Sequence, residues 1–293
     1  MLLILSVTIL IFLIVLSVII YLILKNKENK EDHKEKQKEG KKENNLENIQ
    51  INQNKKIIKK IYMLWYDGFD KAPELVKKCV KSWKYHNPDW EIILLDENNL
   101  RNYFEYKDYN IDFSDKKYHK TQISDVIRTI LLKKYGGVWA DATTFCTKPL
   151  NSWLPKHIDQ DFFAFENIQK DNLISSWFLY STPNSYMINK LLEDVVEYVN
   201  KNKVNKDYFF YHHTFYRRYK KDNIFKNHWD KIPKISAIPP HFIQENGLYS
   251  KLSNKVKDHI DKKKANVYKL TWKIKYDDRK DSNYQYLVST ILS

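Results

Sequence analysis

The stretch that decides the fold runs from Thr121 to Cys146 and reads TQISDVIRTILLKKYGGVWADATTFC. Apolar residues recur at helical spacing in its first half, and Gly136-Gly137 stops that pattern. Residues 138–146 follow with alternating side chains, which predicts a β-strand. The order of helix, glycine turn and strand indicates an α/β fold.

The segments on both sides repeat this alternation. Strands are predicted at 57–65, 90–95, 161–165 and 174–180, and helices from Pro73 to Asn87, at about 97–104 behind a capping Asp96, and from Pro183 to Val199. Alternating strands and helices favour a mostly parallel sheet flanked by helices. We therefore expect one α/β domain over residues 57–293.

The N-terminal part has a different composition. Residues 2–24 carry no charged side chain, and these 23 residues would make a helix of roughly 34 Å, long enough to cross a bilayer core. Residues 25–56 hold 10 Lys against 7 acidic residues and few large apolar ones. We therefore predict a transmembrane anchor at 1–24 and a charged flexible linker at 25–56.

The charges that flank the anchor predict its orientation. Only Met1 precedes it, whereas eight lysines follow between Lys25 and Lys42. Short basic segments are retained in the cytoplasm, so we expect a cytoplasmic domain on a single-pass membrane protein. A lumenal orientation of the Golgi type is the competing view.

Charge and composition narrow the class of function. The net charge is +14, of which +3 belongs to residues 25–56, so +11 remains for the domain. This excess suits a phosphate-bearing substrate or an anionic membrane surface and does not separate the two. The aromatic residues lie in apolar periodic segments, as core residues do, so we expect no nucleic-acid partner. Cys79 and Cys146 are too few for a disulfide framework and are predicted to be buried.

Three charged residues of the central stretch are candidates for chemistry. Asp141 follows the double glycine, where a carboxylate at a strand end can hold a divalent cation. Asp125 and Arg128 stand three apart on the predicted helix, so they project from neighbouring positions. Taken singly, Asp141 could cap a turn and the pair could be a surface ion pair. Together they favour a site.

These residues also carry a resemblance to a known family. The strings are Ser124-Asp125-Val126-Ile127-Arg128, Lys134-Tyr135-Gly136-Gly137-Val138-Trp139-Ala140-Asp141-Ala142-Thr143, Cys146-Thr147-Lys148-Pro149-Leu150, Pro239-Pro240-His241 and Leu270-Thr271-Trp272-Lys273. In this order and spacing they resemble the capsular polysaccharide synthesis proteins, which belong with the DXD sugar-transferases of glycosyltransferase family 32. The likeness covers nearly all of residues 57–273.

The resemblance implies a GT-A fold and a hexosyltransferase-like activity. A sugar would move, with retention at the anomeric carbon, from a nucleotide diphosphate sugar to a hydroxyl of a glycan or other acceptor. Asp125 and Arg128 match the catalytic, donor-binding acid and base, and Asp141 matches the first, metal-binding acid of DXD. Thr143 stands where many relatives have the second acid and could supply only a hydroxyl to the donor. The capsular subgroup resembles this Asp-Ala-Thr form.

Two further residues complete the predicted site. Trp65 ends the first strand, where a GT-A domain receives the nucleotide base, so it could stack on that base; the alternative is a core Trp. His241 follows two prolines that favour an extended approach, and its imidazole could be a second metal ligand, favouring Mn²⁺ over Mg²⁺. The alternative is a surface or hydrogen-bonded His.

The predicted function is therefore a membrane-anchored glycosyltransferase of polysaccharide or glycoconjugate synthesis. Because the second acid is replaced by Thr143, the main alternative is a weakly active or inactive transferase-like scaffold of a glycan-assembly complex. Donor turnover separates the two.

Overall fold

The structure, a computed structural model, describes residues 57–158, 160–169 and 171–292. The predicted anchor at 1–24 and linker at 25–56 lie outside these residues. No helix in the described ranges is long and apolar enough to cross a membrane. Residues 57–293 group by their contacts into one unit, which contains everything described below.

A five-stranded sheet forms the centre of this unit. Its order is β2-β1-β3-β6-β5, with β1 at Lys60–Leu64, β2 at Glu91–Leu95, β3 at Gly137–Ala140, β5 at Phe162–Gln169 and β6 at Asn172–Ser181. β1 pairs in parallel with β2 and β3, whereas β6 is antiparallel to both β3 and β5. Four strands therefore point one way, and the predicted mostly parallel sheet is confirmed, with β6 as the exception.

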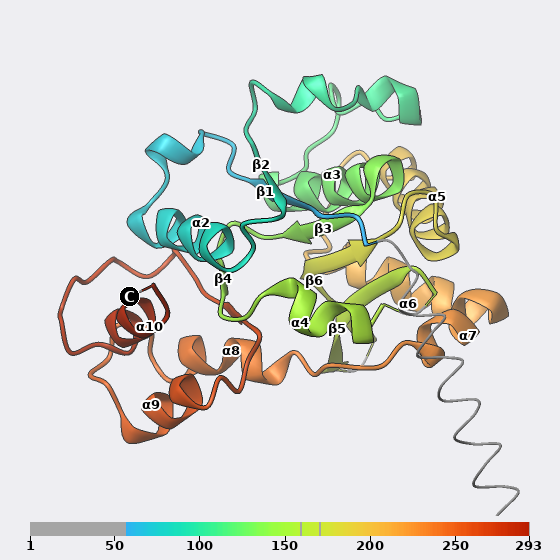
Figure 1. Ribbon diagram of the computed structural model, residues 1–293. Coiled ribbons are helices and arrows are strands. Elements are labelled where there is room, and N and C mark those ends of the chain that lie inside the picture. Colours follow the sequence, from blue (N-terminus) through green and yellow to red (C-terminus); the bar gives the residue numbers. More distant parts are fainter. Residues whose placement is uncertain (1–56, 159, 170, 293) are drawn as a thin grey trace, which may run out of the picture. The chain divides into compact units, whose positions relative to one another are not determined.

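Helices cover both faces of the sheet (Figure 1). They are α2 at Glu74–His86, α3 at Lys120–Tyr135, α4 at Leu150–Trp153, α5 at Tyr186–Lys201, α6 at Phe210–Lys221, α7 at Asn223–Lys231, α8 at Ile238–Glu245, α9 at Asn254–Asp261 and α10 at Asn283–Leu292. Trp83 of α2 stacks on Phe178, whereas Arg128 of α3 lies over Trp139. Trp139 pairs with Leu179, the neighbour of Phe178, so α2 and α3 lie on opposite faces.

A second, smaller core is built around β4 at Thr144–Cys146 and β7 at Val267–Lys269, which pair antiparallel. Apolar side chains of α8, α9 and α10 pack there, in the part coloured orange to red in Figure 1. α2 contributes to both cores, with Val80 and Trp83 in the main one and Leu75, Val76 and Cys79 in the smaller one. Cys79 and Cys146 are buried and free, as predicted. The two cores meet where β3 ends.

The double glycine between α3 and β3 is required because other parts of the backbone and a proline ring approach it closely. Gly136 has φ 66° and Gly137 has φ 99°, where side chains are disfavoured. A Cβ on Gly136 would lie 2.6 Å from Cδ of Pro183, and one on Gly137 would lie 2.7 Å from the carbonyl oxygen of Lys60. Only glycine therefore lets β3 enter beside β1.

The strand predicted at 138–146 is two strands. The chain turns after Ala140: the carbonyl oxygen of Asp141 accepts hydrogen bonds from N and Oγ1 of Thr144, at 2.9 and 2.7 Å. β3 then belongs to the main sheet and β4 to the small one. Residues 142–146 are as buried as β3, so the apolar pattern continues across this turn and the sequence alone hides it.

Two predicted helices also differ. Residues 97–104 contain only a 3₁₀ turn at Leu100–Asn102, although Asp96 Oδ1 accepts from the backbone N of Asn98 and Asn99, both at 2.8 Å, as a helix-capping residue does. The helix predicted from Pro183 begins at Tyr186, since Asn184 has φ 56° and Ser185 caps the first turn.

Candidate functional site

A cleft of about 580 Å³ opens at the carboxyl ends of β1 and β3. The chain runs from β1 to β2 on one side and then returns to β3 on the other side of β1, so the strand order reverses here. Open α/β sheets bind their ligands at such a point. Trp65, Asp141, Thr143 and His241, four of the six predicted site residues, line this cleft.

The other two predicted residues lie beneath its floor. Arg128 and Asp125 form an ion pair of 2.9 Å on α3, and the Arg128 side chain is only 4% exposed. Arg128 also donates to the backbone oxygen of Ser176 at 2.6 Å. The interpretation as a surface pair is therefore wrong, and Arg128 acts as a buried support.

Asp141 is held by three partners. Its Oδ1 accepts from Nη2 of Arg128 at 3.2 Å and from Nε1 of Trp139 at 2.9 Å. Its Oδ2 accepts from Nζ of Lys269 at 2.8 Å, and the same ammonium donates to Oγ1 of Thr143 at 2.8 Å. The carboxylate, the guanidinium and the ammonium therefore form one connected cluster on the floor.

The charge distribution of this cluster separates its two acids. Burial raises the pKa of Asp125 to about 7, with Arg128 opposing the rise and Asp141 adding to it. Burial also acts to raise the pKa of Asp141, but Lys269 and Arg128, with hydrogen bonds from Lys269 and Trp139, hold that pKa below its usual value. Asp141 therefore keeps its charge at neutral pH, and Asp125 is the acid that can take up a proton there.

One wall of the cleft is aromatic. The rings of Trp65 and Trp272 meet edge to face with 5.5 Å between their centroids. Trp65 is partly buried and packs against the smaller core, while the Trp272 residue is 50% exposed. Trp65 therefore packs on the core and also lines the cleft, and its stacking on a nucleotide base stays a prediction.

His241 lies on α8, among the cleft-lining residues. Its Nδ1 is 2.8 Å from the carbonyl oxygen of Ala237, one helical turn earlier. Pro239 and Pro240 belong to this helix, so the extended approach predicted for them is wrong; prolines are tolerated in a first helical turn. None of the contacts described joins His241 to Asp141, and its role as a metal ligand stays a prediction.

The residues around Asp141 do not fit a divalent cation as they are arranged. A Mn²⁺ or Mg²⁺ site needs several oxygen or nitrogen donors that are free to face the ion. Here Lys269 occupies the position between Asp141 and Thr143 and bonds to both. No group of three His, Cys, Asp or Glu residues in the described part of the chain is placed to hold a metal ion.

Sequence reasoning missed Lys269, as it missed Trp272 of the aromatic wall. Lys269 stands at the end of β7, directly before the string Leu270 to Lys273 that carries part of the family resemblance. The signal was its position beside that string. A lysine among 50 basic residues gave no chemical reason for singling it out, because only the pairing of β4 with β7 brings it to Asp141.

Comparisons with known proteins found similarity to one family and to glycosyltransferases. The family model for the capsular polysaccharide synthesis protein matches residues 17–287. The O-glycosyltransferase braB of Annulohypoxylon truncatum is 29% identical over 97 residues, which are 30% of this chain and 23% of that relative. A solved structure, the PaToxG glycosyltransferase, is 18% identical with a TM-score of 0.39 over 58% of this chain and 73% of its own.

The family match spans most of the chain and confirms the predicted family, and the printed name of the fungal relative agrees with the predicted class of enzyme. The chain spans less than a quarter of that relative's length. This chain belongs to the capsular polysaccharide synthesis protein family.

Proposed function

We propose that this chain is a glycosyltransferase of the GT-A type that acts in polysaccharide or glycoconjugate synthesis. It moves a sugar from a nucleotide diphosphate sugar to a hydroxyl group of a glycan acceptor, with retention at the anomeric carbon. Family membership, the cleft at the point where the strand order reverses, and the charged floor of that cleft support the proposal. Retention rests on the resemblance of the central motifs.

The observation that carries the proposal is the charge cluster at Asp141. Departure of a nucleotide diphosphate leaves negative charge on the phosphate oxygens, and preorganised positive groups that face this charge lower the barrier. Lys120, Lys269 and Lys273 line the cleft, with Asp67 and Asp141 as the acids among its lining residues. The cleft therefore presents more cationic than anionic side chains to the donor.

The proposed transfer step is balanced without a covalent enzyme intermediate. The bond between the anomeric carbon and the phosphate oxygen breaks, and its electron pair goes to the diphosphate. The acceptor oxygen forms the new bond on the same face of the sugar, and its proton passes to a phosphate oxygen of the leaving group. Asp141 does not attack in this scheme; it holds Lys269 and Arg128 in place.

The aromatic wall provides a place for the nucleotide base. Trp65 and Trp272 stand beside the end of β1, and a base can stack on an indole with a gain of about 1–3 kcal/mol. The sugar and diphosphate would then extend along the floor toward Asp141.

Membrane attachment through residues 1–24 and a cytoplasmic catalytic domain are further parts of the proposal. Their support is the uncharged N-terminal segment and the eight lysines that follow it. Protease added outside intact cells should leave residues 57–293 whole. Digestion from outside would instead place the domain in the lumenal orientation.

The direct test is turnover of donor by the full-length chain in detergent. We expect a panel of nucleotide sugars to reveal one donor that is hydrolysed slowly to its nucleoside diphosphate, and Asp141→Asn should remove that hydrolysis. A chain that binds a nucleotide sugar but hydrolyses none of the panel, with and without added acceptor glycans, would support the scaffold alternative.

A further inference from the structure

Lys269 bonds to both polar side chains of the Asp141-Ala142-Thr143 segment. Its ammonium lies 2.8 Å from Oδ2 of Asp141 and 2.8 Å from Oγ1 of Thr143, so it bridges the first and third residues of the segment. These are the two positions at which a DXD motif carries its acids. The ammonium therefore occupies the place where a bridging cation would be bound.

The charges of the segment balance around this ammonium. Two carboxylates would balance a divalent cation, whereas here one carboxylate, Asp141, faces one ammonium and Thr143 adds a neutral hydroxyl. The absent acid and the ammonium of Lys269 each make the segment more positive by one charge, and together they match the two charges of the ion. A metal ion at the same place would meet the repulsion of Lys269, and Arg128 also lies 3.2 Å from the carboxylate.

The ammonium remains able to act on a ligand. A lysine has three N–H donors, and two are used by Asp141 and Thr143. Lys269 lines the cleft and its side chain is 19% exposed, so the third donor can reach an anion that enters there. Its backbone is fixed by the pairing of β7 with β4, in which Lys269 lies opposite Thr144.

We propose that Lys269 replaces the divalent cation of this site, so that the chain binds the diphosphate of its donor and transfers the sugar without a metal ion. This inference rests on the proposed function. The third N–H of the ammonium donates to a diphosphate oxygen, and the charge-assisted hydrogen bond strengthens as negative charge develops on the leaving group. Lys269 stays protonated, and the acceptor proton still leaves with the phosphate.

Binding of Mn²⁺ to the full-length chain tests the proposal without any turnover. Electron paramagnetic resonance should detect no saturable Mn²⁺ site that depends on Asp141 in the wild-type protein. Lys269→Met removes the competing ammonium, and it should create such a site. Wild-type binding that Asp141→Asn abolishes would overturn the proposal, and this measurement does not require Lys269→Met to fold.

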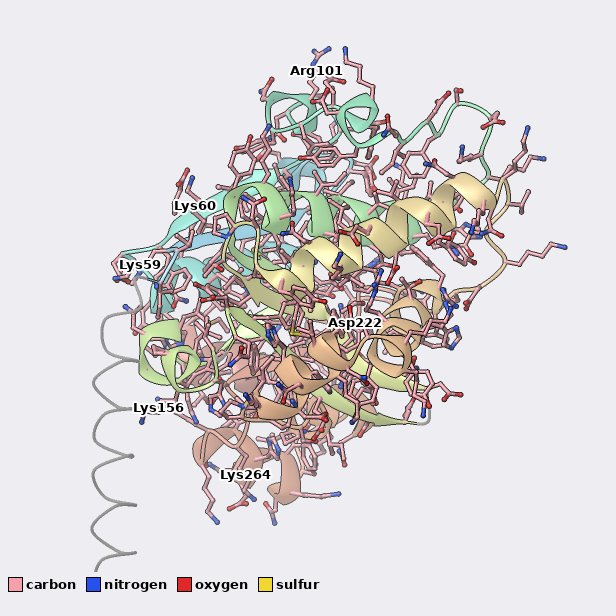
Figure 2. All side chains as sticks on the ribbon, turned by 90° about the vertical axis from the view of Figure 1, so that its right-hand side faces the viewer. Lys59, Lys60, Arg101, Lys156, Asp222 and Lys264 are labelled. Carbon is pink, nitrogen blue, oxygen red and sulfur yellow. The ribbon has the colours of Figure 1, made fainter. Side chains whose placement is uncertain are left out.

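A second experiment measures the binding of nucleoside diphosphates. With EDTA present, calorimetry with uridine or guanosine diphosphate should show binding to the wild-type chain, a loss of at least tenfold in Lys269→Met, and partial retention in Lys269→Arg. Lys264→Met is the matched control, because Lys264 extends from the periphery of the molecule and pairs with Asp258, which retains Lys262 (Figure 2). That variant should bind like the wild type.

The outcomes separate this proposal from the proposed function. Transfer that occurs with Mn²⁺ and stops in EDTA would leave the glycosyltransferase in place and overturn the role of Lys269. If no donor is turned over under any condition, the proposed function fails, and the Mn²⁺ measurement still decides whether Lys269 occupies the cation position.

Discussion

The floor and the aromatic wall of the cleft differ in how firmly their side chains are held. Beneath the floor, Arg128 is buried and bonded to Asp125, Asp141 and the backbone of Ser176. On the wall, Trp272 is 50% exposed, and Tyr208, which also lines the cleft, is 60% exposed. The floor is therefore set before a ligand enters, as charge stabilisation requires, whereas the wall can adapt to its ligand.

This difference suggests that the floor and the wall recognise different parts of the donor. Every nucleotide diphosphate sugar carries the same diphosphate, which suits a rigid, charged floor, while bases and sugars vary and suit an adjustable aromatic surface. The variants below test this division in order of the size of the effect.

Arg128→Met should give the largest effect, on stability. It leaves the buried Asp125 and the partly buried Asp141 near each other without their shared partner, and losing one member of a buried ion pair costs about 3–5 kcal/mol. Urea unfolding measures the change. Arg279→Met is the control, since Arg279 pairs with Asp281 at the surface, where the two side chains are 46% and 54% exposed, and should cost less. Equal losses would show that the floor is no more rigid than the surface.

Asp141→Asn should act mainly on the rate. The carboxamide is similar in size but no longer anchors Lys269 and Arg128 by charge, so transfer should fall by about 10²–10³-fold, as for loss of one preorganised charge-stabilising group. Circular dichroism should show an unchanged fold. If the activity stays within a few-fold of the wild type, the charge of Asp141 is not needed for catalysis.

Trp65→Ala should affect donor binding more than the rate. Loss of a stacked base is worth about 1–3 kcal/mol, so the KM for the donor should rise by roughly 5- to 150-fold with a smaller change in kcat. Trp272→Ala should change KM in the same direction, and this exposed residue can be replaced with little loss of packing. If Trp65→Ala unfolds the domain and Trp272→Ala leaves the KM unchanged, the two tryptophans serve packing and do not bind the base.

The pKa of Asp125 predicts a pH dependence of stability. With a folded pKa of about 7, Asp125 takes up a proton as the pH falls from 8 to 5, while the unfolded carboxyl is still charged. The wild type should therefore gain stability relative to Asp125→Asn over that range. Unfolding midpoints at several pH values measure the difference, and a constant difference would mean that Arg128 keeps Asp125 charged throughout.

His241→Ala should give the smallest effect. If Lys269 takes the place of the cation, removing His241 changes neither the rate nor its response to Mn²⁺ by more than a few-fold. A rate that becomes dependent on Mn²⁺ and is partly restored by excess Mn²⁺ would make His241 a metal ligand, as the sequence pattern suggests.

Local patterns predicted most of the central elements. The helical spacing from Ile123 to Leu131 predicted α3, because an amphipathic helix repeats its apolar residues every three to four positions. The double glycine predicted the turn before β3, because a positive φ favours glycine. They also placed Asp125, Arg128 and Asp141 together, since these residues lie on one short segment. The helices after α5 were not predicted, because they have 8 to 12 residues against 16 in α3 and α5, so a helical spacing has few turns in which to repeat.

The sequence by itself determined the alternating α/β order, the family and the acids and arginine of the site. Tertiary structure alone decided that the strand after Gly137 breaks at Asp141, that Arg128 is buried, and that Lys269 lies beside an aspartate 128 positions earlier. The physical reason is the range of the interactions. Helix periodicity and glycine turns are set by neighbours within a few residues, whereas the pairing of β4 with β7 and the ion contacts it creates join segments that no local pattern relates.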